Sequence, residues 1–114
     1  MRFQDEATMR TEKVKAELSN LEVHMGPFRQ SALKTKATAV YEDLLLTVTG
    51  EKLVVKLHAR NMGNVHLEKK AVRIAAMNFE ITERDGNPSV VSGSVRLEFE
   101  SQADADAWYK ELWQ

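Results

Sequence analysis

Apolar side chains recur at every second position through most of the chain after residue 21, a spacing typical of strands with one buried face. The sets that step by two are Leu21/Val23, Ala37/Ala39/Tyr41, Leu44/Leu46/Val48, Leu53/Val55/Leu57, Val65/Leu67, Val72/Ile74, Phe79/Ile81 and Val95/Leu97/Phe99. Short strands at close spacing, with no helix between them, favour antiparallel pairing because a parallel crossover needs a dozen or more residues. The pattern therefore predicts an antiparallel meander of about seven strands.

Turn residues separate these runs. Gly50-Glu51 joins two runs closely enough for a hairpin. Gly26-Pro27, 61–64 and 85–88 carry the glycine, proline and asparagine chemistry of longer turns. Glu42-Asp43 leaves two alternatives open, since it could divide residues 36–49 into two strands or form a bulge in one.

Both ends of the chain favour helix. Over residues 3 to about 18, Glu6/Arg10 and Glu12/Lys15 have the spacing of helical ion pairs. A thin apolar line accompanies them, formed by Phe3, Ala7, Val14 and Leu18. We therefore expect an N-terminal helical extension over residues 1–20 and a separate folded domain over residues 21–114.

At the other end, Ser101 has the chemistry of a helix N-cap, and Asp104 follows three residues later. Ala105, Trp108 and Leu112 are spaced along one helical face. A barrel of antiparallel strands has an open end, and this helix is expected to cover it with Trp108 over the core.

Composition limits the function classes. A chain of 114 residues with 43% hydrophobic content fits one domain. Its 16 basic and 17 acidic side chains give a formal charge of -1, which argues against nucleic-acid binding. The absence of cysteine suits a reducing, cytoplasmic location. The longest aliphatic run, 44–46, is far too short to span a membrane, so any membrane contact is expected to be peripheral.

No motif names a reaction. His24, His58 and His66 lack the spacing of metal ligands. Residues 92–94 do not fit the serine-nucleophile pattern, and no glycine-rich phosphate loop is present. We therefore expect no catalytic residue, no cofactor and no metal, and a protein that is not an enzyme.

The order of the elements resembles the pleckstrin homology (PH) superfamily, whose members end in a last strand, a short polar turn and a helix that bears a tryptophan. Here those elements are 95–99, 101–104 and 108–112, and 46–56 is similar to an early hairpin of the family. The resemblance covers residues 21 to 113. It implies a mostly β fold, a PH-like barrel or sandwich capped by the C-terminal helix, in which Trp108 is a fold determinant. More specifically, the chain is similar to inner membrane complex sub-compartment proteins of apicomplexan parasites.

Charge is distributed unevenly, because residues 24–70 hold eight basic against four acidic side chains and residues 71–114 hold four against eight. In PH domains that bind inositol phosphates, a basic-x-basic pair follows the first strand, and Lys34-Thr35-Lys36 fits it. The resemblance implies a basic loop made of Arg29, Lys34, Lys36, Lys56, His58 and Arg60.

The chain departs from the family's binding signature where His24 replaces a first-strand lysine. The expected function is therefore a non-catalytic protein-interaction or scaffolding module at a membrane-associated or cytoskeletal structure. A phosphoinositide-binding domain for peripheral membrane targeting is the alternative. The expected partners are proteins, with an anionic membrane or phosphoinositide as a further contact. Oligomeric state is left open.

Overall fold

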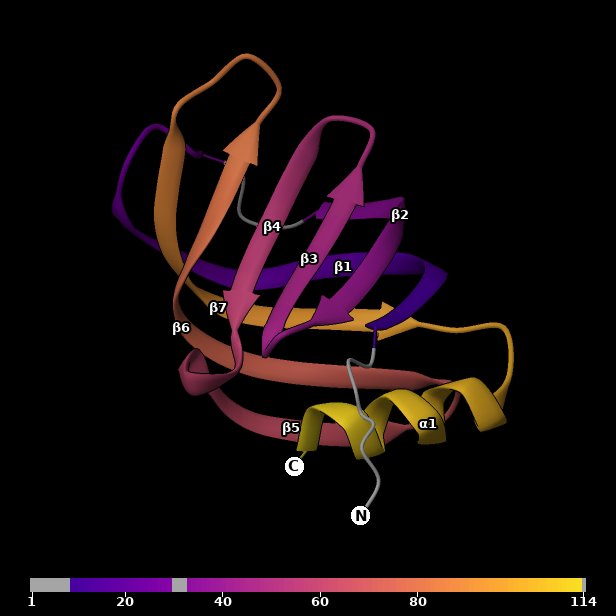
Figure 1. The fold of residues 1–114 in the computed structure, drawn as a ribbon. Helices are drawn as coiled ribbons and strands as arrows, with labels where there is room; N and C mark the ends of the chain where they lie inside the picture. Colours follow the sequence, from indigo (N-terminus) through magenta and orange to yellow (C-terminus); the bar gives the residue numbers. More distant parts are fainter. Residues whose placement is uncertain (1–8, 30–32, 114) are drawn as a thin grey trace.

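The computed structural model describes residues 9–29 and 33–113, and these residues form an antiparallel barrel with a helix at one side (Figure 1). The elements are β1 (Met9–Met25), β2 (Leu33–Glu42), β3 (Leu45–Gly50), β4 (Leu53–His58), the 3-10 helix η1 (Ala59–Asn61), β5 (Met62–Glu68), β6 (Ala71–Glu83), β7 (Pro88–Glu98) and α1 (Gln102–Trp113). The expectation of a mostly β chain with a C-terminal helix is confirmed.

Two meanders make up the sheet. Strands β1 to β4 pair in chain order, as do β5 to β7, and β1 pairs with β7 to join the two sets. Strand β6 is shared, because its first half pairs with β5 and its second half, from Glu80 to Glu83, pairs with β4. This last pairing closes a barrel of six strands, with β5 as an additional strand.

The hairpin expected at Gly50-Glu51 is present between β3 and β4. The alternative left open at residues 36–49 resolves into two strands, joined by a turn at Asp43 and Leu44. Both residues have positive φ, 60° and 64°, as a type I′ turn requires. The turn expected at 61–64 is wrong, since η1 ends there and β5 begins at Met62.

The expected N-terminal helix is wrong for residues 9 to 18, which belong to β1. Val14, Ala16 and Leu18 are buried, while Lys13 and Lys15, which alternate with them, are exposed. This alternation places one apolar face on the core, and pairing with β2 and β7 on both sides satisfies the backbone. Residues 3–8 of the expected helix lie outside the described residues. The boundary expected at residue 20 falls inside β1.

The helix α1 begins as its sequence predicts, because the Asp104 N–H donates to the Ser101 Oγ at 3.1 Å. Its apolar face is buried against the barrel, and Trp108 has no exposed surface. The Trp108 ring stacks on Phe99 with centroids 5.7 Å apart. The expected packing of the helix over the core is therefore confirmed.

Candidate functional site

The structure separates the basic residues that the sequence groups together. Lys34 and Lys36 are exposed on the first part of β2, where Lys36 lies opposite Lys15 of β1. Lys56 lies on β4, opposite Thr47 and Glu80. The paired registers place Lys56 four residues along and two strands across from Lys36, roughly 16 Å of sheet.

The other three predicted residues, His58, Arg60 and Arg29, lie away from Lys34 and Lys36. His58 lies opposite Leu45 at the end of β4, and Arg60 is in η1. Arg29 follows the buried Phe28 beyond the end of β1. The expected six-residue basic loop is therefore divided, with Lys34 and Lys36 on β2 and a second group, Lys56, His58 and Arg60, on β4 and η1.

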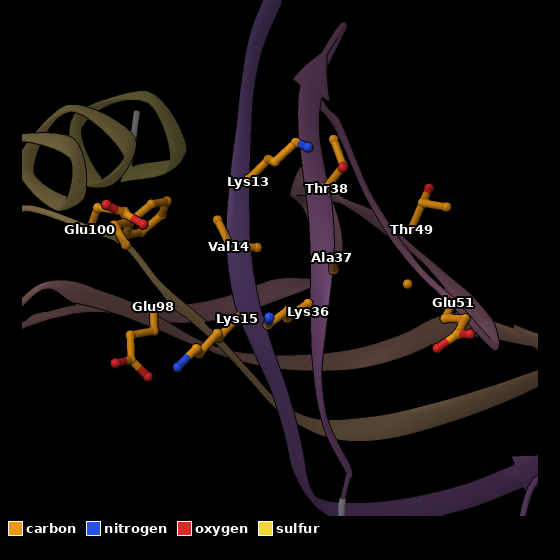
Figure 2. A pocket seen from close by; sticks show the side chains of 12 residues that line it. Lys13, Val14, Lys15, Lys36, Ala37, Thr38, Thr49, Glu51, Glu98 and Glu100 are labelled. Atoms are coloured by element: carbon orange, nitrogen blue, oxygen red, sulfur yellow. The ribbon is translucent and has the colours of Figure 1, made fainter.

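The structure instead assembles a cluster from two adjacent strands. Lys13 and Lys15 project from β1 beside Lys36 of β2, on the outer side of the barrel. They line a groove of about 600 Å³, which we call the lysine groove (Figure 2). Its lining consists of Lys13, Val14, Lys15, Lys36, Ala37, Thr38, Thr49, Gly50, Glu51, Glu98, Phe99 and Glu100.

Charge alternates across this groove. Figure 2 shows the three lysines between Glu98 and Glu100 on one side and Glu51 on the other. In the described part of the chain, no carboxylate oxygen lies within 4.0 Å of the ammonium groups of the three lysines. Within the described ranges, the groove thus offers three lysines without a carboxylate partner, between acidic walls.

Lys34 differs from these three lysines, because its Nζ lies 3.8 Å from Glu98 Oε1. Glu98 also accepts a hydrogen bond from Arg96 Nη1 at 3.4 Å. One lysine of the expected Lys34/Lys36 pair is therefore committed within the protein, and the other faces the groove.

An ion-pair network lies beside the groove. Glu68 accepts hydrogen bonds from Arg73 Nε at 2.7 Å and from Arg96 Nε at 2.9 Å. These bonds, the one from Arg73 above all, lower the pKa of Glu68 below its usual value. The hydrogen bond to Glu68 is the main reason why the pKa of Arg96 is raised. The network joins the end of β5 to β6 and β7, so its role is to stabilise the sheet.

His24 and Ser92 form a polar pair that the sequence does not reveal. His24 Nε2 lies 2.7 Å from Ser92 Oγ, which also accepts the Asn78 N–H at 3.2 Å. Asn78 has φ 55° and lies where the β6–β7 register shifts. The pair therefore holds irregular strands together. Among residues 9–29 and 33–113, no group of three acidic or histidine side chains could hold a metal.

Sequence reasoning missed Lys13 and Lys15 because it placed them on a helix. The signal that would have found them is the alternation of these lysines with Val14, Ala16 and Leu18. An alternating strand puts both lysines on one exposed face, whereas a helix would place them about 200° apart.

No helix in the described ranges is long and apolar enough to cross a membrane. Comparison of the chain with protein-family models, with curated proteins and with solved structures found no match.

Proposed function

We propose that this chain is a non-catalytic PH-like module that binds a protein partner through its lysine groove. The observation that carries the proposal is that Lys13, Lys15 and Lys36, which have no carboxylate partner among the described residues, share one groove with acidic walls. The closed barrel, capped by a helix with a buried tryptophan, agrees with the PH resemblance. The module would act as a scaffold at a membrane-associated or cytoskeletal structure that its partner supplies.

The acidic walls favour a protein over an inositol phosphate. A polyphosphate headgroup gains from clustered cations, but its charge would also be repelled by Glu51, Glu98 and Glu100. A protein surface can place both signs of charge against the groove and so satisfy lysines and glutamates together. His24, which stands where the family's first-strand lysine is expected, is bonded to Ser92 instead.

Phosphoinositide binding is the second candidate, and one observation favours it. Three lysines on adjacent strands β1 and β2 share an exposed face next to Lys34. Sedimentation with vesicles that contain or lack phosphoinositides, at two salt concentrations, tests this candidate. Saturable binding that selects the headgroup at about 0.15 M salt would favour it over the protein partner, because diffuse attraction is screened at that ionic strength.

Charge reversal tests the protein-binding proposal. The groove variant carries Lys13→Glu, Lys15→Glu and Lys36→Glu. The matched control carries Lys52→Glu, Lys56→Glu and Lys69→Glu, which make the same change at exposed lysines outside the groove. Cross-linked complexes of each variant, purified from source cells and quantified by mass spectrometry, should lose partners in the groove variant and keep them in the control. Equal recovery by both variants would contradict the proposal.

A further inference from the structure

Among residues 9–29 and 33–113, the first four residues of β2 have no strand partner on the edge directly beside the lysine groove. The strand pairs with β1 from Leu33 to Glu42 but with β3 only from Ala37 onward. Among the described residues, no backbone hydrogen bond joins the outer edge of residues 33–36 to another segment. The chain leaves this edge at Gly50, which lines the groove. A sheet edge with free donors and acceptors is a template for one further strand.

Strand geometry says which backbone groups are available. A Cβ built on Gly50 would lie 3.6 Å from the Lys36 carbonyl oxygen, so this carbonyl faces the β3 side. Because successive residues of a strand direct their backbone groups to opposite edges, the N–H and C=O groups of Lys34 and Lys36 face the free edge. The Thr35 hydroxyl donates to the Lys36 carbonyl at 3.3 Å, which leaves that oxygen a second lone pair.

The side chains beside this edge determine which kind of segment would bind there. Lys34 and Lys36 are exposed on the outer face, whereas Leu33 and Thr35 are half-buried and Leu33 packs against the core. A strand added here places alternate residues opposite Lys36 and Lys34. Acidic side chains are favoured at both positions, although the one opposite Lys34 would share this lysine with Glu98. The residues between them lie opposite Thr35 and Leu33, where apolar β-branched side chains fit.

We propose that an extended acidic segment of a partner protein adds to β2 as a strand, antiparallel to it and in line with β3 beyond Gly50. This inference rests on the proposed function, since it names how the partner uses the lysine groove. The segment alternates acidic and apolar residues, with acidic side chains opposite Lys36 and Lys34. Gly50 already occupies the position opposite Ala37, so a basic residue just before the first acidic one would have to turn away from β2, toward Glu51 in the β3–β4 turn.

The probe that tests this is a fluorescent peptide of sequence Gly-Lys-Glu-Val-Glu-Val-Thr, measured by anisotropy at about 0.15 M salt. Saturable binding is expected, together with amide NMR shifts centred on β2 residues 33–36. A charge-swapped peptide with lysines in place of both glutamates should not bind. Absence of saturable binding by the glutamate peptide would overturn the inference.

N-methylation separates strand addition from charge attraction alone. Methyl groups on the amides of both glutamates remove the donors that face β2, so binding should fall at least about tenfold. Methyl groups on both valine amides face away from β2 and should leave binding within about twofold. Equal binding by the two methylated peptides would overturn strand addition, while the lysine groove would remain a charged docking surface.

Protein variants complete the test. Lys36→Glu should weaken binding of the peptide at least about tenfold. The control Lys56→Glu, outside the groove, should not weaken binding. Inositol hexakisphosphate is the competing probe. If it displaces the peptide at low micromolar concentration and Lys36→Glu abolishes its own binding, the groove is a phosphate site and the inference is overturned. If the peptide does not bind but the groove variant still loses its partners in cells, strand addition is overturned and the proposed function is kept.

Discussion

Trp108 Nε1 donates a hydrogen bond to Glu12 Oε1 at 3.1 Å, joining residues 96 positions apart. Glu12 lies on β1 and Trp108 on α1, so the bond ties the first strand to the last helix. The indole has one polar atom, and this bond satisfies it while the ring packs on Phe99. The helix is therefore held over the barrel by both apolar packing and a specific contact with β1.

Trp108→Ala should lower the free energy of unfolding by about 3–5 kcal/mol, because it removes a fully buried aromatic side chain and leaves a cavity. Denaturant unfolding measures the loss. Trp108→Phe is the comparison, since it keeps an aromatic ring but leaves Glu12 without its donor, at a cost of about 1–3 kcal/mol from that contact. A loss below about 1 kcal/mol for Trp108→Ala would show that the helix does not support the barrel.

Removal of residues 1–18 should abolish cooperative unfolding. The deletion takes away the buried Val14, Ala16 and Leu18 and leaves β2 and part of β7 without their partner strand. Circular dichroism during thermal unfolding measures the effect. A matched deletion of residues 1–8 retains all of β1 and should unfold cooperatively. A cooperative transition in the longer deletion would mean that β1 is dispensable.

The fold was largely predictable after residue 21, where apolar alternation and turn residues are strong. The start of the chain was not, because Glu12 and Lys15 also suit a helical ion pair while Val14, Ala16 and Leu18 suit a strand. Local spacing alone does not decide between them. Pairing of β1 with β2 and β7, which are distant in sequence, supplies the hydrogen bonds that favour the strand.

The candidate site was less predictable than the fold. Lys34 and Lys36 were found from the resemblance, but the residues that accompany them depend on strand register. Lys15 lies opposite Lys36 only because β1 is a strand in this register. Lys56, expected nearby, lies opposite Thr47, and Thr47 lies opposite Val40 rather than Lys36. Such relationships arise from pairing across the sheet, which composition and local spacing do not encode.

The turn between β2 and β3 predicts a stabilising substitution. Leu44 adopts φ 64° and is 67% exposed, so it has the steric cost of a left-handed conformation with little packing in return. Leu44→Gly should raise the free energy of unfolding by about 1 kcal/mol, since glycine adopts this conformation without that cost. The control Leu45→Gly, in β3, should be destabilising. A destabilised Leu44→Gly protein would mean that the exposed side chain makes a contact that matters.

The hydrogen bonds to Glu68 predict how the free energy of unfolding depends on pH. Hydrogen bonds from Arg73 and Arg96 lower its pKa in the folded state, so the contribution of ionised Glu68 is present above the ordinary value of 4.5 and lost as pH falls through the folded pKa. The difference in unfolding free energy between the protein and its Glu68→Gln variant should therefore shrink on acidification. An NMR titration of the Glu68 carboxyl should give a pKa below 4.5, and Arg73→Gln should raise it. An unchanged pKa in Arg73→Gln would contradict the assignment.

The backbone conformation and close neighbours of Gly26 predict that this position does not tolerate a side chain. It has φ 108°, and a Cβ there would lie 2.4 Å from Ser89 Oγ, which accepts the Phe28 N–H at 3.0 Å. Gly26→Ala should destabilise the protein by about 2–3 kcal/mol through strain and loss of that bond. Gly86→Ala is the control, because its Cβ would lie no closer than 3.4 Å to another atom. Similar melting temperatures for the two variants would contradict the prediction.

The pairing of β1 with β7 has a consequence for synthesis of the chain on the ribosome. Strand β1 emerges first, yet its partner on one side is completed only at Glu98. Until β7 leaves the exit tunnel, the sheet that contains β1 to β4 stays open, because the edge of β1 that β7 covers has no partner. The helix that carries Trp108 emerges later still. Closure of the barrel therefore waits for β7, and a nascent chain that lacks this strand exposes an unpaired strand edge of the kind that promotes aggregation.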